Sequence, residues 1–461
     1  MIEYILQRLN DFLSRIVSLW RSRFGPIIKF NSISIRVQNV IDEGGFSTIF
    51  LATDVDQSIF PTNYALKRIR CHDSASRNAC IKESKIHYAL MEDQKKQQRE
   101  RQGGDPLIAA GGATKIKDIS IETIDDALSS HFMPLLGSTF SENNCFFYML
   151  FPYIPHSLRK EVQRRIWEPI EDFSSNKSMS LMSKSQQNQK VKDVLRMPPW
   201  SETIVLRWFE QLMDAVILMH NAGYTHRDIK LDNVLLHPEL PPAMKSTSVL
   251  LQDNHMYNRA SGPVLIDFGS AGDLLSPLTT RRELLMIVDE AENHTTISYR
   301  PPELFAGELR VAESNASISN PSDTVSSTVM SDDEEVDHEL FLDYRKVDVW
   351  CLGCTLFAIL FGASPGEVEF SRSTGKLIIV DPSHNKVLGM MPWPNDDTPP
   401  ANWYSYDVKE LLGWMLTHNR RNRPTMEQVR QRVRDILSHR PSFFQGNSRL
   451  TSDIESLKVD L

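Results

Sequence analysis

The feature that most restricts the fold of this chain is a polar run near its middle, His226 to Asn233 (HRDIKLDN). A periodic amphipathic stretch, residues 200–221, comes before it, and the apolar Val234-Leu235-Leu236 follows it. These flanking patterns predict a helix and a short strand, so the polar run forms the loop between them. Asp228 and Asn233 stand five residues apart, and one can therefore meet a hydroxyl while the other holds a metal.

The polar run resembles the catalytic loop of the protein kinases, H-R-D-x-K-x-x-N. An isolated His-Arg-Asp triplet would more often be a surface ion pair, but the whole pattern beside an apolar strand is much rarer by chance. The resemblance implies an α+β, bilobal fold, in which a small antiparallel β-sheet lobe with one helix joins a larger, mainly helical lobe. It also implies that Asp228 accepts the proton of a hydroxyl and that Lys230 reaches the transferring phosphate. A lysine at this place marks the serine/threonine type.

A glycine turn near the N-terminus gives a second part of the resemblance. Strands are expected over 33–37, 49–52, 64–69, 132–140 and 145–153, and Gly44-Gly45 lies between the first two. Two adjacent glycines alone would predict an ordinary hairpin. Together with Lys67 in the third strand, they resemble the glycine-rich loop G-x-G-x-x-G-x-V, whose backbone approaches phosphates.

Only Gly44 keeps its place in the pattern of that loop. Asp42 stands at the first glycine position, Ser47 at the third and Ile49 at the valine position. The acidic side chain at Asp42 is a departure that is expected to weaken nucleotide binding. The resemblance implies an ATP site formed by Asp42, Glu43, Gly44, Gly45, Ser47, Ile49, Ala65, Lys67, Glu83, Phe151, Tyr153 and Ile154.

Lys67 needs an anionic partner, because a lysine inside an otherwise apolar strand is costly without one. The family places a glutamate in the following helix, which is expected here over residues 77–91. Glu83 is the only glutamate in residues 71–90, so it is the expected partner of Lys67. Phe151 takes the gatekeeper position, and Tyr153 and Ile154 belong to the hinge that would bind the adenine edge through its backbone.

An apolar strand that ends in Asp267-Phe268-Gly269 resembles the family's metal-binding motif. By itself it could be an ordinary strand and turn. With Asn233 upstream, Asp267 is implied to be the principal Mg²⁺ ligand and Asn233 the second. Thr296 stands five residues before Pro301, where the family has a threonine that contacts the catalytic Asp and Lys, and it is grouped with the catalytic residues.

The activation segment, Asp267 to Glu303, is longer than usual and contains a stretch with helical spacing, residues 281–294. Arg227 can pair with a phosphate on one of four residues of this segment: Ser276, Thr279, Thr280 and Thr295. Equally, the extra helix can hold the segment open without modification. Further along, Asp348 is implied to accept hydrogen bonds from the catalytic-loop backbone, and Arg423 to pair with Glu303.

The domain organisation follows from these motifs and from changes of composition. A kinase domain is expected over 30–438, with the smaller lobe at 30–153 and the larger at 154–438. Polar or low-complexity insertions interrupt it at about 92–130, 174–197, 241–259 and 311–340, and a flexible tail occupies 439–461. The first of these insertions can begin as an extension of the helix before it.

Residues 1–25 have apolar residues at helical spacing with interspersed arginines. A helix packed on the domain and an interfacial helix lying on a membrane are both consistent with this pattern. Ile2 offers no myristoylation site, and no cysteine precedes Cys71, so an attached lipid is not expected here.

At finer grain the chain resembles the Golgi- and vacuole-associated, typically lipid-anchored kinases of the numb-associated group. Three segments carry this resemblance: 43–47 (EGGFS), 65–72 (ALKRIRCH) and 296–300 (TISYR). A cytoplasmic protein is expected because the sequence shows neither an apolar run of 18 or more residues nor a signal peptide. The resemblance adds endomembrane contact through residues 1–25 and a role in membrane trafficking as weaker expectations.

Composition excludes several other functions. The formal net charge of −8 argues against bulk binding of nucleic acid. Cys351 and Cys354 lie in an apolar run and are expected to be buried thiols rather than half of a zinc site. Expected partners are ATP and protein substrates. The alternative is a pseudokinase scaffold, which only the thin glycine loop favours.

Overall fold

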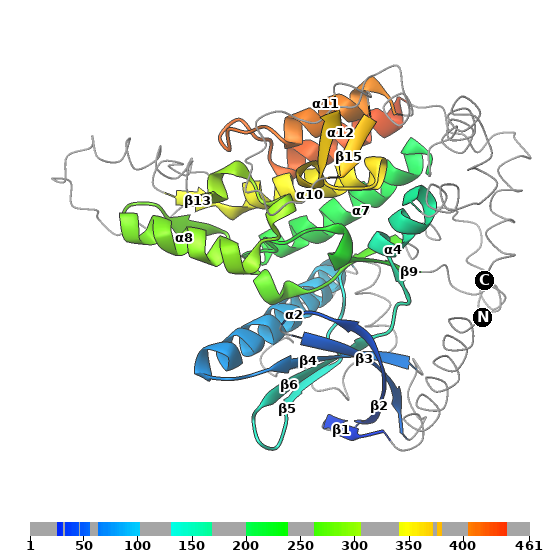
Figure 1. The fold of residues 1–461 in the computed structure, drawn as a ribbon, viewed down its shortest axis with the longest axis vertical. Helices are drawn as coiled ribbons and strands as arrows, with labels where there is room; N and C mark the ends of the chain where they lie inside the picture. The colour runs from blue at the N-terminus through cyan, green and yellow to red at the C-terminus, as the bar shows by residue number, and fades with distance from the viewer. Residues whose placement is uncertain are drawn as a thin grey trace, which may run out of the picture.

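The computed structural model describes residues 25–30, 33–45, 47–55, 63–101, 131–167, 200–237, 262–305, 341–371, 376–379 and 404–439. These residues form two lobes, one built on a β-sheet and one mainly of helices (Figure 1). Each lobe has its own cluster of buried apolar side chains. The bilobal α+β architecture expected from the sequence is confirmed.

The smaller lobe is a six-stranded antiparallel sheet with the order β1-β2-β3-β4-β6-β5. Its strands are β1 (Ile27–Phe30), β2 (Ile33–Glu43), β3 (Ser47–Asp54), β4 (Asn63–Arg70), β5 (Gly137–Phe140) and β6 (Phe146–Pro152). In the centre of the sheet, Lys67 of β4 lies opposite Ile49 on one side and Met149 on the other. Lys67 is therefore held by strands on both sides.

Helix α2 (Ser74–Arg101) joins the two lobes. Its Cys80 belongs to the buried cluster of the sheet lobe, whereas Ile86 and Leu90 belong to the cluster of the larger lobe. Figure 1 shows the helix running beside the sheet toward the larger lobe. Because both cores hold α2, the position of Glu83 on it depends on both lobes.

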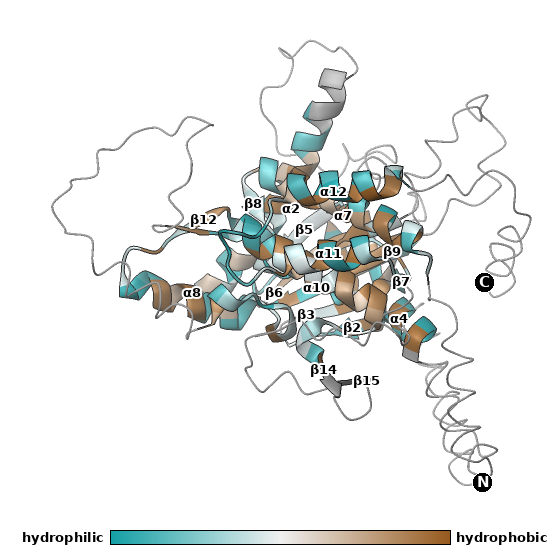
Figure 2. Cartoon of the chain, turned by 90° about the horizontal axis from the view of Figure 1, so that it is seen from above, coloured by the Kyte–Doolittle hydropathy of each residue, from teal (hydrophilic) through white to brown (hydrophobic). Residues whose placement is uncertain are grey.

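The larger lobe is built around α7 and α10, which are largely buried. Its helices are α4 (Leu158–Val162), continued by a π-helical turn (Gln163–Trp167), and α7 (Glu202–Asn221), α8 (Arg281–His294), α10 (Tyr344–Phe361), α11 (Tyr406–Met415) and α12 (Met426–Ser438). Helix α12 packs on α7 and alternates hydrophilic and hydrophobic residues along its length (Figure 2). Cys351 and Cys354 of α10 are fully buried, as expected for core thiols.

Short strands and single turns at the lobe junction position the polar loop. The strands are β7 (His156–Ser157), β8 (Tyr224–Thr225), β9 (Val234–His237), β10 (Gly262–Leu265), β11 (Gly272–Asp273), β12 (Leu275–Pro277), β13 (Phe341–Asp343), β14 (Val368–Ser371) and β15 (Lys376–Ile379). The 3₁₀ turns are Leu231–Asn233, Phe268–Ser270, Ile297–Tyr299, Pro302–Leu304 and Pro365–Glu367. Antiparallel pairing of β9 with β10 sets Val234 opposite Leu265, which brings Asn233 and Ile266 together.

Some element boundaries differ from those expected. Residues 132–136 were expected to be strand, but they are irregular apart from a parallel bridge between Phe132 and Leu265. These residues are buried against both lobes, so their apolar character reflects the core rather than a ladder. Helix α2 runs into the insertion expected from residue 92, as a helix extension.

Several other expectations fall outside the described residues. They are the helix at 1–25 apart from Gly25, the rest of the insertion at 92–130, the insertions at 174–197, 241–259 and 311–340, and the tail apart from His439. Within the part of the chain that the structure describes, no helix is both long and apolar enough to cross a bilayer.

Candidate active site

The polar loop after α7 lies between the lobes, and its two apolar members fasten it to the larger lobe. Ile229 and Leu231 are fully buried. The alternating polar side chains, Asp228 and Lys230, form a 2.8 Å ion pair between Lys230 Nζ and Asp228 Oδ2. Asn233 Nδ2 donates to the backbone carbonyl of Asp228 at 2.8 Å. The three polar residues singled out from the sequence therefore meet.

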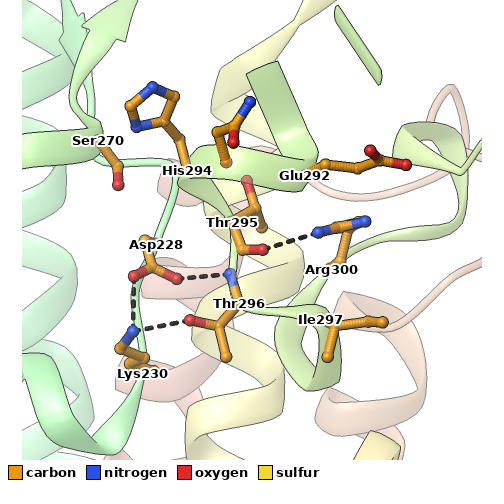
Figure 3. A pocket seen from close by; sticks show the side chains of 10 residues that line it. Asp228, Lys230, Ser270, Glu292, His294, Thr295, Thr296, Ile297 and Arg300 are labelled. Carbon is orange, nitrogen blue, oxygen red and sulfur yellow. Dashed lines mark hydrogen bonds and ion pairs between the residues drawn. The ribbon is translucent and has the colours of Figure 1, made fainter. Parts of the chain in front are cut away.

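Thr296 completes this group from the other end of the activation segment. Its backbone N–H donates to Asp228 Oδ1 at 2.9 Å, and its Oγ1 accepts from Lys230 Nζ at 2.7 Å. Figure 3 shows the resulting ring of contacts through Asp228, Lys230 and Thr296. The contact between Thr296 and both residues, which was expected from its place in the sequence, is confirmed.

A cavity of about 540 Å³ opens beside this ring. Its lining is Asp228, Lys230, Ser270, Glu292, Asn293, His294, Thr295, Thr296, Ile297 and Arg300. Most of these residues come from the end of α8 and the turn after it. An extended peptide could place a hydroxyl next to the Asp228 carboxylate here, with Lys230 on the other side of it.

The backbone of the catalytic-loop segment has an unusual conformation, which a carboxylate of α10 stabilises. Arg227 has φ of 68°, in the left-handed region that non-glycine residues rarely adopt. The fully buried Asp348 of α10 accepts from the backbone N–H groups of His226 and Arg227 at 2.9 and 2.7 Å. His220 Nε2 lies 2.9 Å from the same carboxylate. The predicted role of Asp348 is confirmed, and His220 adds a contact that was not foreseen.

Lys67 lies at the centre of a charge cluster that links the two lobes, in which Lys67 and Glu83 are buried and Asp267 is partly exposed. Its Nζ is 2.7 Å from Glu83 Oε1 and 2.7 Å from Asp267 Oδ1. The predicted pair with Glu83 is confirmed. Burial opposes the charged form of Lys67, but the two carboxylates outweigh it and raise its pKa. Burial raises the pKa of Glu83, whereas the charge of Lys67 holds the pKa of Asp267 well below its usual range.

The oxygen atoms near Asp267 suit a magnesium ion. The Asp267 side chain is 46% exposed, and its backbone has φ of 65°, which turns the residue away from the strand before it. The amide nitrogen of Asn233 donates to Asp228, so its Oδ1 is the atom left for a ligand. Mg²⁺ prefers a few carboxylate or amide oxygens and completes its shell with water and phosphate. The described residues hold no cluster of three or more His, Cys, Asp or Glu suited to a metal, which is consistent with so sparse a donor set.

The glycine turn joins β2 to β3 at the edge of the site. Gly44 N–H donates to Ser47 O at 2.9 Å, and Gly44 and Gly45 are both exposed. A Cβ atom on Gly45 would meet nothing within 4 Å, so packing does not require glycine there. Asp42 Oδ1 accepts from the backbone of Glu43 at the tip of β2. The turn thus presents exposed backbone beside one exposed carboxylate.

The remaining predicted nucleotide residues line the sheet and the start of the connection to the larger lobe. Ala65 of β4 lies opposite Phe151 of β6. Phe151 and Ile154 are buried and Tyr153 is half-buried, which is the order expected for a gatekeeper followed by a hinge. The structure brings these residues to the same side of the junction as Lys67, because β4 and β6 are neighbours.

Phe268 contacts two histidine rings, one tilted and one edge-on, and the sequence alone did not indicate this arrangement. The His87 ring of α2 lies 4.3 Å from Phe268, and Phe268 lies 5.6 Å from His226. Burial lowers the pKa of His87 to about 3, so the ring is neutral. Its Nδ1 lies 3.1 Å from Met133 O. His87 occurs four residues, one helical turn, after Glu83, and that spacing is the signal that could have identified it.

The end of the activation segment is anchored by a buried ion pair. Arg423 Nη1 and Nη2 bind the two oxygens of Glu303 at 2.6 and 2.9 Å, and Arg423 also donates to the carbonyls of Lys346 and Thr417. Its guanidinium lies over the ring of Trp350. The predicted pairing of Arg423 with Glu303 is confirmed.

Comparison with known proteins gives a family match and several relatives. The model of the protein kinase domain family matches residues 156–331 and 336–433, which is more than half of the chain and covers the larger lobe. A probable serine/threonine-protein kinase of Dictyostelium discoideum is 23% identical over 92% of this chain, which spans 26% of that longer relative. Mouse serine/threonine-protein kinase 16 is 23% identical over 87% of this chain and 89% of its own length. Serine/threonine-protein kinase ppk13 of Schizosaccharomyces pombe is 24% identical over 80% of this chain and 81% of its own length.

Proposed function

The chain belongs to the protein kinase domain family, and on that premise we propose that it transfers the γ-phosphoryl group of ATP to serine or threonine hydroxyls of protein substrates. The observation that carries the proposal is the ring of contacts among Asp228, Lys230 and Thr296 beside an open cavity. A folding role alone would not require a lysine and an aspartate to be paired on the wall of an open cavity.

Each polar residue has a distinct part in the proposed reaction. Asp228 orients the substrate hydroxyl and accepts its proton as the oxygen attacks in line. Lys230, already 2.8 Å from Asp228, lies close enough to neutralise the charge that develops on the transferring group. Thr296 keeps both side chains in place, so the hydroxyl meets a preformed arrangement.

Lys67 and Asp267 act on the nucleotide side. Lys67, fixed by Glu83, positions the phosphates of ATP, and Asp267 and Asn233 would hold Mg²⁺, which neutralises phosphate charge when bound. The exposed backbone at Gly44 and Gly45 covers the phosphates. Ala65, Phe151 and the hinge residues Tyr153 and Ile154 surround the adenine.

The alternative of a pseudokinase scaffold has one observation in its favour, the exposed carboxylate of Asp42 next to the glycine turn. Against it stands the complete set of polar residues at the junction of the lobes. A scaffold that binds no nucleotide would gain no thermal stability from Mg·ATP, whereas a kinase would.

We further propose membership of the numb-associated group and a role at endomembranes, in membrane trafficking. Kinases of that group resemble one another in carrying a helix late in the activation segment, and α8 supports the assignment because it lies there. The proposal of membrane contact rests on the amphipathic pattern of residues 1–25. A fusion of residues 1–30 that remains wholly soluble beside anionic vesicles would contradict it.

The test of the proposed activity is autophosphorylation of the purified chain with Mg·ATP, compared with Asp267→Ala. We expect phosphate on serine or threonine in the wild type and none in the variant. Label on tyrosine would contradict the substrate class. Absence of label in both proteins, with no stabilisation by Mg·ATP, would favour the scaffold.

A further inference from the structure

The guanidinium of Arg227, the neighbour of Asp228, is enclosed on every side. Its Nη1 lies 2.7 Å from Glu290 Oε1 of α8, and its Nη2 donates to Asp273 O at 2.8 Å. Its Nε donates to Thr225 Oγ1 at 3.3 Å, and its Cζ lies 3.6 Å from the ring centroid of Tyr344. Only 5% of the Arg227 side chain is exposed.

The strand beside Arg227 is shaped to admit its guanidinium. A Cβ atom on Gly272 of β11 would lie 2.4 Å from Arg227 Cζ, so any other residue there would displace the guanidinium from its present position. A buried arginine is unfavourable unless an anion compensates its charge. Among the residues that the structure describes, Glu290 provides the carboxylate within salt-bridge distance of Arg227.

Glu290 lies toward the C-terminal end of α8, together with Asp289 and Glu292, where the helix dipole disfavours negative charge. The opposite charge of Arg227 offsets this cost. Arg300 also donates to the carbonyls of Ala291 and Thr295, so a second arginine closes the same helix end.

The hydroxyls that could carry a regulatory phosphate already have structural roles. Thr280 caps α8 through Glu283, and Thr279 Oγ1 donates to Glu283 as well. Ser276 lies in β12, paired with β13. Thr295 is 6% exposed and ends the helix. A phosphate on Thr279 or Thr280 would lie beside the carboxylate of Glu283, and a phosphate on Thr295 would have to fit at a buried position.

We propose that Glu290 serves as the built-in anion of Arg227 and holds the activation segment in its working conformation without phosphorylation. Kinase activation segments are commonly ordered by a phosphate that pairs with arginine. Here a carboxylate carried by α8 takes that place. Glu290 is therefore a positioning residue, which acts on Asp228 through Arg227 and on Thr296 through the end of α8. This inference rests on the proposed kinase activity.

Two measurements test it on the full chain. In the first, the wild type is treated with a broad-specificity protein phosphatase, and mass spectrometry verifies that residues 267–303 carry no phosphate. The kcat for a peptide substrate is expected to stay within about twofold of the untreated value, because the anion is part of the chain.

In the second, Glu290→Gln is compared with Asp289→Asn, which removes the same charge from an exposed neighbour on the same helix. We expect Glu290→Gln to lower kcat by about tenfold through misplacement of the catalytic loop. The KM for ATP and the thermal stabilisation by Mg·ATP should be unchanged, because Lys67 and Asp267 are untouched. Asp289→Asn should remain within about twofold of the wild type in kcat.

The outcomes separate the two proposals. An active wild type that loses its activity on dephosphorylation overturns the role of Glu290, and so does a Glu290→Gln variant that matches Asp289→Asn. A wild type inactive in every state overturns the kinase activity itself. The phosphatase measurement needs no variant, so it can overturn the role of Glu290 even where Glu290→Gln does not fold.

Discussion

Lys67 and Asp267 lie 200 residues apart in the chain, and yet Lys67 Nζ is 2.7 Å from Asp267 Oδ1. Glu83 Oε1 also lies 2.7 Å from Lys67 Nζ. The contact joins a strand of the smaller lobe to the Asp267-Phe268-Gly269 turn of the larger one. The two lobes are therefore closed on each other in a way that brings together the groups proposed to bind phosphate and metal.

Glu83→Gln should impair catalysis more than folding. Lys67 would then pair with Asp267 alone and would no longer be held at the position where phosphates bind. We expect kcat/KM for ATP to fall by roughly 10- to 100-fold. Glu92→Gln, at an exposed position further along α2, is the matched control. Steady-state kinetics of both variants test this, and equal values for both would contradict it.

Glu303→Gln should destabilise the larger lobe, since it would leave the fully buried Arg423 without its charge partner. Removing one member of a buried ion pair costs about 3–5 kcal/mol of unfolding free energy. Glu410→Gln breaks the exposed pair with Arg432 and should cost less than about 1 kcal/mol. Urea denaturation of the two variants measures the difference. Similar losses in both would show that Arg423 finds sufficient compensation in its carbonyl partners.

The neutral ring of His87 should make stability depend on pH. Its pKa is about 3 in the folded chain, whereas an unfolded histidine titrates near 6.5. Between these values the unfolded chain binds the extra proton, so lowering the pH favours unfolding. From pH 7.5 to pH 5 the wild type should lose roughly 2 kcal/mol of unfolding free energy relative to His87→Leu. Denaturant titrations at several pH values measure this difference, and a constant difference would contradict it.

The exposed carboxylate of Asp42 should weaken the binding of ATP, because it adds negative charge beside the turn that covers the phosphates. Asp42→Asn is expected to lower the KM for ATP by about threefold at low salt. The advantage should shrink as ionic strength rises, since exposed charges are screened. An unchanged KM at every salt concentration would show that Asp42 lies too far from the phosphates to matter.

The contacts of the site could largely be predicted from sequence motifs, because each involves residue types that are costly to bury alone. Lys67 required an anion, and Glu83 was the glutamate available in the next helix. The same reasoning paired Arg423 with Glu303. In these cases burial and charge restrict the choice so strongly that the spacing of the motifs is enough.

The pairing of Arg227 could not be predicted in this way. Helical spacing indicated α8 with its actual limits, Arg281–His294, but α8 carries acidic residues at 283, 289, 290 and 292. Which of these meets Arg227 depends on how the helix is rotated and docked, which local sequence does not determine. The prediction of a strand over residues 132–136 was wrong for a similar reason. Burial between two lobes and burial in a strand give the same apolar composition, so composition does not distinguish them.

The most direct measurement is phosphotransfer by Asp228→Asn beside its binding of Mg·ATP. The substitution keeps the shape of the side chain but removes the proton acceptor. We predict a loss of roughly 10²–10⁴-fold in kcat, with thermal stabilisation by Mg·ATP equal to that of the wild type, because the nucleotide is held by other residues. Turnover close to that of the wild type in this variant would contradict the assignment of Asp228 as the catalytic residue of a kinase.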